Sequence, residues 1–211
     1  MNLNDRDIDS LNDNQKDDKE KNGNEKKFSR PKDSVKIIEV GPRDGLQNES
    51  KILDLDQKLN FVLDLVDSGL KSIEVTSFVR ADRVPQMADS EKIYQKVVEK
   101  INDQSVRFPC LVPNAKGMEN ALKAGVKEIA LFTATSEEFN KKNINATIEQ
   151  SIKNIEQVAE MATNSNVQIR GYISTVFGCP YEGDTSLDML FKLSEKLLAL
   201  GVYEISLGDT I

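Results

Sequence analysis

The chain has 211 residues, 30% of them charged, and a formal net charge of -7. This length allows one sizeable core or a large piece of a bigger domain, and the acidic balance argues against a protein that grips nucleic-acid phosphates. No run of about 18 apolar residues and no apolar stretch of signal-peptide type occurs, so we expect neither a membrane-spanning nor a secreted protein.

The chain contains no histidine. Histidine is the commonest general base near neutral pH and the commonest ligand of transition metals. Chemistry performed by this chain alone must therefore use carboxylates, Arg, Lys, Cys or Tyr. The two cysteines, Cys110 and Cys179, lie far apart in the sequence, so neither a disulfide framework nor a zinc knuckle is indicated. A reducing compartment fits this pattern best.

Residues 1–34 are crowded with Asn, Asp and Lys and contain few apolar side chains. This composition predicts a disordered polar tail. The many acidic residues in it argue against a mitochondrial transit peptide without excluding one. Residues 35–211 have a different texture and are predicted to belong to one folded domain.

From residue 35 onward, short β-rich apolar runs alternate with amphipathic stretches. Six runs have the length of buried strands: residues 35–40, 72–76, 108–112, 128–132, 168–173 and 203–207. Apolar spacings of three and four predict helices around residues 59–66, 94–101, 118–122, 148–162 and 190–200. Gly69, Gly125 and Gly201 each stand between a helix and a strand, where a helix C-terminus favours glycine.

Strict alternation of strands and helices predicts an α/β fold with a parallel sheet. Residues 41–45, after the first run, lack the G-x-G-x-x-G spacing of a dinucleotide-binding turn, which weakens the doubly wound form. A closed barrel would need eight units, and six are predicted. Periodicity alone therefore leaves an open sheet and a barrel nearly balanced.

Reactive side chains of parallel α/β folds gather where strands end. The residues at such positions are Arg43, Asp44 and Gln47 after the first strand, Glu74, Thr76 and Ser77 in and after the second, and Asp209 and Thr210 after the sixth. We expect three carboxylates and one arginine from these strand ends to converge on one mouth.

Two interpretations remain open for these charged residues. Asp44 beside Arg43 has the chemistry of a hard-cation ligand next to an oxyanion clamp, but composition alone favours a turn aspartate in a surface ion pair. Glu74 lies inside an apolar run, where a buried carboxylate must be paired, although a solvated edge is the alternative. Asp209 could equally be a simple capping residue.

Other reactive side chains have ordinary structural interpretations. Cys179 has no nearby His, Lys or Arg in the sequence to lower its pKa, which favours a structural loop cysteine over a nucleophile. Cys110 lies in a predicted buried strand and is expected in the core. Lys141 and Lys142 could meet a phosphate-bearing substrate, but an exposed pair at a helix start is the ordinary explanation.

Five stretches resemble motifs of the 3-hydroxy-3-methylglutaryl-CoA lyases. They are residues 39–49, 73–79 with 84–87, 141–145, 170–172 with 178–183, and 204–210. The related isopropylmalate and homocitrate synthases typically carry a Leu-Arg-Asp-Gly form of the first motif, so Gly-Pro-Arg-Asp-Gly-Leu-Gln points to the lyase branch. The resemblance implies a TIM (β/α)8 barrel, incomplete, with about six β/α units present.

The resemblance also implies a reaction: cleavage of 3-hydroxy-3-methylglutaryl-CoA to acetyl-CoA and acetoacetate, in leucine breakdown and ketone-body formation. Asp44 would hold a divalent cation, Mg²⁺ or Mn²⁺, that chelates the substrate. Arg43 would bind substrate and stabilise the enolate of the departing acetyl-CoA. Gln47 and Thr210 would bind substrate, and Glu74 or Asp209 would assist proton transfer from the tertiary hydroxyl.

The family also uses two histidine ligands on the seventh strand, an asparagine in the eighth unit and a reactive cysteine after the eighth strand. None of these falls within this chain, and Cys179 corresponds to the loop after the fifth strand instead. We therefore expect a C-terminally truncated barrel that is inactive alone. The alternatives are a non-catalytic isoform that binds a full-length subunit, or an acetyl-CoA-dependent synthase of the same superfamily.

The expected partner is 3-hydroxy-3-methylglutaryl-CoA, with no nucleic acid or membrane partner and with homo-oligomerisation left open. The expected location is the cytoplasm, with the mitochondrial matrix as the alternative.

Overall fold

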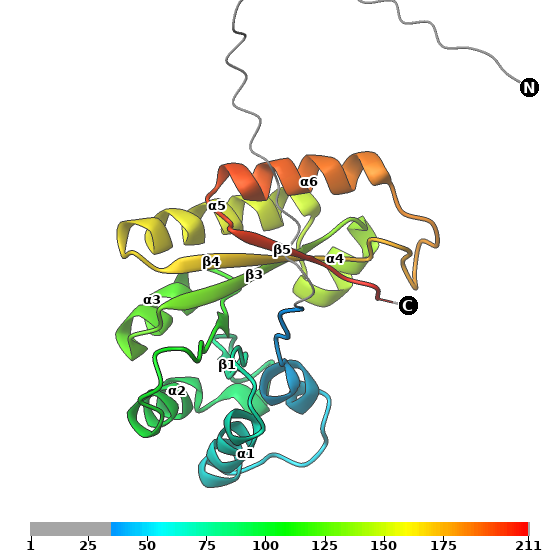
Figure 1. The fold of residues 1–211 in the computed structure, drawn as a ribbon. Helices are drawn as coiled ribbons and strands as arrows, with labels where there is room; N and C mark the ends of the chain where they lie inside the picture. Colours follow the sequence, from blue (N-terminus) through cyan, green and yellow to red (C-terminus); the bar gives the residue numbers. More distant parts are fainter. Residues whose placement is uncertain (1–34, 211) are drawn as a thin grey trace, which may run out of the picture. The chain divides into compact units, whose positions relative to one another are not determined.

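The computed structural model describes residues 35–210, so the tail predicted for residues 1–34 lies outside the described part. Strands and helices alternate along this part of the chain (Figure 1). One parallel sheet has the order β1-β2-β3-β4-β5. Its strands are β1 (Thr76–Ser77), β2 (Cys110–Leu111), β3 (Glu128–Ala134), β4 (Gln168–Ser174) and β5 (Glu204–Leu207). Each strand pairs with its neighbour in sequence, as in a (β/α) barrel.

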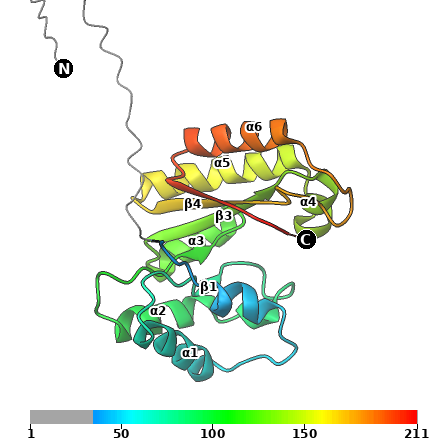
Figure 2. The same ribbon diagram turned by 45° about the vertical axis from the view of Figure 1, so that its right-hand side comes forward.

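The helices lie along the outer side of the curved sheet (Figure 2). They are α1 (Leu55–Asp67), α2 (Ser90–Lys100), α3 (Ala115–Ala124), α4 (Glu137–Ile144), α5 (Ile148–Asn164) and α6 (Leu187–Ala199). Five of these confirm the predicted helices. None of the helices in the described range is long and apolar enough to span a bilayer.

Helix α4 was not predicted, because its eight residues carry no apolar stripe. It begins at a polar cap, where the hydroxyl of Ser136 accepts a hydrogen bond from the backbone N–H of Phe139 at 3.0 Å. Lys141 and Lys142 lie in its last turn, so their predicted place at a helix start is wrong. Cations are favoured there because the C-terminal end of a helix carries partial negative charge.

The first predicted strand, residues 35–40, forms only an isolated bridge between Glu39 and Ile73. The backbone N–H of Glu39 donates to Ser72 at 2.9 Å, and that of Glu74 donates back to Glu39 at 2.8 Å. The chain then turns into a π-helical segment, η1 (Gly41–Gly45). This run therefore lies beside the residues that lead into β1, as a very short parallel addition to the sheet. Strands β1 and β2 are also shorter than predicted.

Position 41 needs glycine because the backbone comes close to its neighbours. The Gly41 N–H donates to the carboxylate of Glu39 at 2.6 Å, and a Cβ on Gly41 would lie only 2.9 Å from that oxygen. The predicted helix-ending glycines are also confirmed, with φ of +97° at Gly69, +84° at Gly125 and +86° at Gly201.

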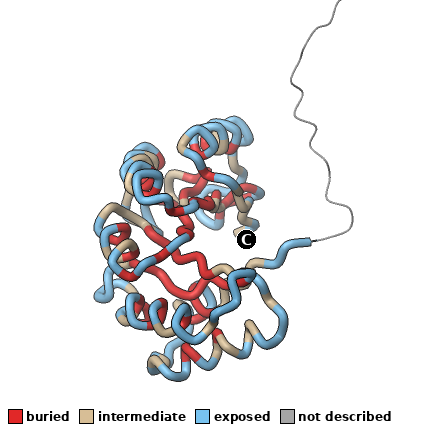
Figure 3. Tube along the Cα trace, turned by 60° about the vertical axis from the view of Figure 1, so that its left-hand side comes forward, coloured by how far each residue is buried: buried red, intermediate tan, exposed pale blue. Residues whose placement is uncertain are grey.

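The main apolar core lies between the strands and the helices. Figure 3 shows the buried segments gathered along the strands and on the inward sides of the helices. Fully buried side chains of this core are Ile73, Ile129, Leu131, Ile173, Met118, Val158 and Leu197. Burying each such side chain stabilises the folded chain by roughly 1.5–3 kcal/mol relative to leaving it exposed. Because strand side chains alternate between faces, this packing turns the intervening residues toward the concave interior of the sheet.

Candidate functional site

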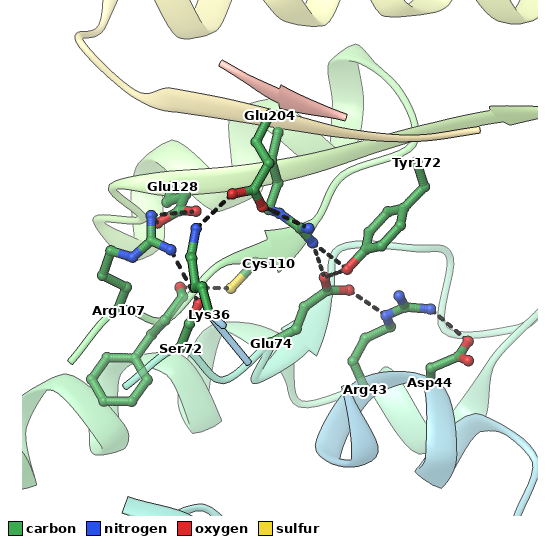
Figure 4. Close-up of polar contacts among 12 residues, drawn as sticks. Lys36, Arg43, Asp44, Ser72, Glu74, Arg107, Cys110, Glu128, Tyr172 and Glu204 are labelled. Atoms are coloured by element: carbon green, nitrogen blue, oxygen red, sulfur yellow. Dashed lines mark hydrogen bonds and ion pairs between the residues drawn. The ribbon is translucent and has the colours of Figure 1, made fainter. Parts of the chain in front are cut away.

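Polar side chains meet on the concave side of the sheet (Figure 4). Arg170 and Tyr172 lie two residues apart in β4, so they share one face, and the parallel register places Arg170 beside Glu204 of β5. We call this group the interior cluster; its members are Lys36, Arg43, Asp44, Glu74, Arg170, Tyr172 and Glu204. It connects the segment that precedes η1 to the last strand of the sheet.

Glu74 is the centre of the interior cluster and has no exposed surface. One carboxylate oxygen accepts a hydrogen bond from Nε of Arg43 in a salt bridge. The other accepts from the hydroxyl of Tyr172 at 2.6 Å and lies 3.8 Å from Nη1 of Arg170. This confirms that the buried carboxylate is paired, and a solvated edge is wrong for Glu74.

Arg43 is fixed by η1 between a buried and an exposed carboxylate. Its Nη1 lies 2.6 Å from Oδ1 of Asp44, whose side chain is 58% exposed, whereas that of Arg43 is 10% exposed. Burial disfavours the charged guanidinium, but Glu74 and Asp44 raise the pKa of Arg43 overall. The pair is thus a buried arginine joined to an exposed aspartate, not a pair of two surface residues.

Tyr172 and Arg170 were missed as site residues. Burial first, and then the negative charge of Glu74, raise the pKa of Tyr172, so its hydroxyl stays protonated and can donate. The guanidinium of Arg170 lies 4.6 Å from the Tyr172 ring centroid and 3.0 Å from Glu204. An arginine and a tyrosine at alternate positions of a predicted strand could have indicated a polar interior face.

Glu204 continues the interior cluster to the opposite side of the arc. Its second oxygen lies 2.8 Å from Nζ of Lys36. Burial acts to raise the pKa of Glu204, but hydrogen bonds from Lys36 and Arg170 lower it overall. A separate polar group lies nearby, where the hydroxyl of Tyr203 donates to Glu128 at 2.5 Å.

The structure brings only part of the predicted set into contact. Arg43, Asp44 and Glu74 are joined, whereas Gln47 is half-buried, Asp209 is exposed, and neither side chain makes a hydrogen bond to another described residue. The hydroxyl of Thr210 accepts a hydrogen bond from the backbone N–H of Thr175 at 2.7 Å. The convergence of Asp209 on the same mouth therefore stays a prediction.

Thr175, at the end of β4, has a left-handed backbone with φ of +58°. A β-branched residue in this conformation is strained, and such strain is held by surrounding contacts. Here Thr210 accepts its N–H, while the hydroxyl of Thr135 donates to its carbonyl oxygen at 2.7 Å. Thr210 thus fixes the turn at the carboxyl end of β4.

The interior cluster offers one side chain suited to binding a metal ion, Asp44. Both oxygens of Glu74 are occupied by Arg43 and Tyr172, whereas Asp44 presents an exposed carboxylate. Carboxylate oxygen suits Mg²⁺ or Mn²⁺. Within residues 35–210, however, no group of three or more His, Cys, Asp or Glu could hold a metal. Asp44 fits as a single ligand, and the described residues do not complete a coordination shell.

Cys179 is buried in a closed turn, as expected for a structural cysteine. Its backbone N–H and carbonyl both pair with Gly183, at 2.7 and 2.9 Å, and its thiol donates to the hydroxyl of Ser136 at 3.0 Å. Burial acts to raise the pKa of Cys179, but the hydrogen bond with Ser136 and the one received from the backbone N–H of Tyr181 lower it overall. This lowering was not predicted, because its source is not a cation.

Comparison with known proteins identifies the family. Residues 34–211 match the HMGL-like family model. The chain belongs to the HMGL-like family. It is 49% identical over 177 residues to the cytoplasmic 3-hydroxy-3-methylglutaryl-CoA lyase of Rattus norvegicus, covering 84% of this chain and 51% of that protein. Lyases named as mitochondrial also match, at 46% identity for that of Macaca fascicularis. The chain spans about half the length of the curated relatives it matches.

Solved structures of this HMGL-like family share the fold. The hydroxymethylglutaryl-CoA lyase of Pseudomonas aeruginosa has a TM-score of 0.79 and 45% identity, covering 84% of this chain and 58% of that one. An HMG-CoA lyase of Acinetobacter baumannii, solved with coenzyme A and 3-methylmalate, has a TM-score of 0.80 and 32% identity, covering 87% and 59%. The predicted resemblance and the incomplete TIM barrel are both confirmed.

Proposed function

We propose that this HMGL-like chain supplies the Arg43 side of an active site that cleaves 3-hydroxy-3-methylglutaryl-CoA to acetyl-CoA and acetoacetate. The observation that carries the proposal is the guanidinium of Arg43, held by the buried carboxylate of Glu74 beside the exposed carboxylate of Asp44. The names of the relatives support the reaction, and the coenzyme A bound to one related lyase supports a thioester substrate.

The reaction breaks a carbon–carbon bond next to a thioester. The proton of the tertiary hydroxyl goes to a base, the C–O bond becomes the ketone of acetoacetate, and the electrons of the broken bond form the enolate of acetyl-CoA. Arg43 stabilises the negative charge on the enolate oxygen, as a positioned cationic donor does. Protonation of the enolate carbon then completes acetyl-CoA.

Glu74 and Asp209 have different roles in this reaction. Glu74 has both oxygens engaged and holds Arg43, so Asp209, which is exposed, is the better acceptor for the hydroxyl proton. Gln47 and Thr210 would contact the substrate from the same ends of the strands. Thr210 would first have to share the hydroxyl that now accepts the backbone N–H of Thr175.

Asp44 would hold a divalent cation, Mg²⁺ or Mn²⁺. When bound, such a cation polarises oxygen atoms of a chelated substrate. One carboxylate leaves most of the coordination shell to water or to another polypeptide, so binding to this chain alone should be weak and turnover absent. The cytoplasm is the proposed location, with the mitochondrial matrix as the alternative, because relatives of both names match.

Reconstitution tests this function. The chain would be refolded with the part of the rat lyase that lies beyond the match on its C-terminal side, in the presence of Mn²⁺ and 3-hydroxy-3-methylglutaryl-CoA. The matched control is the rat enzyme split at the same place and refolded from its own two parts. We expect equal amounts of acetoacetate and acetyl-CoA from both mixtures and none from the chain alone. An active rat pair beside an inactive, correctly assembled mixed pair would contradict the proposal.

A further inference from the structure

Tyr172 contacts both members of the salt bridge that carries the proposed chemistry. Its hydroxyl donates to Oε2 of Glu74 at 2.6 Å, and its ring centroid lies 5.7 Å from the guanidinium carbon of Arg43. Glu74 and Tyr172 are 98 residues apart and come from opposite sides of the arc. In Figure 4 the side chains of Arg43, Glu74 and Tyr172 point toward one another.

We propose that Tyr172 is a positioning residue for Arg43: its hydroxyl fixes the carboxylate of Glu74, and that carboxylate fixes the guanidinium. Any effect of this positioning on catalysis rests on the proposed function, whereas the positioning of Arg43 itself does not. Neither the resemblance nor the strand-end rule assigned Tyr172 a role.

The two carboxylate oxygens of Glu74 accept hydrogen bonds from different residues. Oε1 accepts from Nε of Arg43, and Oε2 accepts from Tyr172. A carboxylate held at one oxygen can still turn about its last side-chain bond, because that torsion is broad. Held at both oxygens it cannot, so the direction of the Arg43 hydrogen bond is set by Tyr172.

Arg170 keeps the tyrosine in place from its other side. It hydrogen-bonds the Tyr172 hydroxyl through Nη1, lies over the ring, and is anchored by Glu204 at 3.0 Å. Arg170 is 3% exposed, so solvent does not compete strongly for these contacts. Tyr172 therefore has a fixed donor direction toward Glu74.

Loss of the hydroxyl should release Arg43 toward its second partner. Without Tyr172 as a donor, the Glu74 carboxylate can rotate toward Arg170, which lies 3.8 Å away. Arg43 would then rely on Asp44, an exposed residue that solvent can reach. The N–H at Nε of Arg43 should consequently become less protected from water.

The test follows the Nε–H signal of Arg43 by ¹⁵N–¹H NMR in the full chain, with assignment by its loss in Arg43→Lys. In Tyr172→Phe we expect this signal to shift and its exchange with water to accelerate by about 10-fold or more. The matched control is Tyr203→Phe, which removes another tyrosine hydroxyl that donates to a buried glutamate, Glu128. This control should leave the Arg43 signal unchanged.

An unchanged Arg43 signal in folded Tyr172→Phe, or an equal change in both phenylalanine variants, would overturn the proposal. If Tyr172→Phe does not fold, 3-fluorotyrosine at position 172 keeps the ring and hydroxyl while making the donor stronger. The Arg43 signal should then shift, and no shift would again overturn the role. Because this readout needs no substrate, failure of the reconstituted lyase assay would be recognised separately.

Discussion

The ammonium group of Lys36 lies 2.8 Å from the carboxylate of Glu204, and 168 residues separate them in the chain. The ion pair joins the segment before η1 to β5, the two outermost parts of the described sheet. Arg170 contacts the same carboxylate, donates a hydrogen bond to the hydroxyl of Tyr172 and forms an ion pair with Glu74. The geometry around Arg43 therefore depends on both sides of the arc.

The first prediction concerns acid stability. The folded chain holds the pKa of Glu204 below its ordinary value of about 4.3, so the unfolded chain takes up this proton more readily. The stabilisation is present above about pH 4.3 and is lost as the pH falls through the lower folded value. We expect Glu204→Gln to show a smaller loss of melting temperature between pH 6 and pH 3.5 than the parent.

The control for this titration is Glu99→Gln, at an exposed position on α2. It should keep the steeper loss of the parent chain. Parallel melting curves for the parent and Glu204→Gln across this range would contradict the assignment.

The second prediction concerns the buried centre. Glu74→Ala leaves Arg43 and Arg170 buried without their shared carboxylate, which should lower the free energy of unfolding by about 3–5 kcal/mol. Urea denaturation measures the change. Glu119→Ala removes an exposed partner of Lys116 and should change the free energy of unfolding much less, because solvent screens that ion pair. Similar costs for the two variants would show that burial does not govern the Glu74 interactions.

The third prediction compares two glycines. A Cβ at Gly117 would lie 2.6 Å from the carbonyl oxygen of Phe78, whereas a Cβ at Gly45 would meet no atom within 4 Å. Gly117→Ala should therefore destabilise the chain by about 1–3 kcal/mol, because backbone must move. Gly45→Ala should change stability little. A thermal melt of both variants decides this, and equal melting temperatures would contradict the packing around α3.

The fourth prediction concerns the thiols. Burial raises the pKa of Cys110 well above its ordinary value, whereas hydrogen bonds lower the pKa of Cys179 despite burial. Iodoacetamide reacts with the thiolate, so Cys179 should be alkylated about 10-fold faster or more, as read by mass spectrometry. Ser136→Ala should slow the reaction at Cys179. Faster labelling of Cys110 would contradict the assignment.

Much of the fold was predictable because local patterns and long-range packing agree. The apolar spacings predicted helices α1 and α5, and the structure contains both. The position of Gly125 between a helix and a strand predicted its left-handed backbone. The π-helical turn at residues 41–45 and the short helix α4 were not predictable by these rules. Their residues are set by caps and by backbone contacts with distant segments, which leave no apolar period in the sequence.

The site was predictable only in part. The sequence predicted Arg43 and Asp44 because they lie where a predicted strand meets a loop, and Glu74 because it is a lone charged residue inside an apolar run. The strand-end rule did not find Tyr172, which lies inside β4 rather than at its end. Its role follows from which residue faces it across the arc, and this pairing joins positions 98 residues apart. Strand periodicity specifies a face but not the partner opposite it.

The most direct test of the account is the rate of acetoacetate formation by the reconstituted enzyme when Arg43 is replaced. Arg43→Met removes the proposed donor to the enolate oxygen and should lower the rate by at least about 10²-fold. Arg80→Met, which removes an exposed arginine paired with Asp82, serves as the control and should retain the parent rate. If Arg43→Met retained the rate of the Arg80→Met control, Arg43 would not be the catalytic centre of this chain.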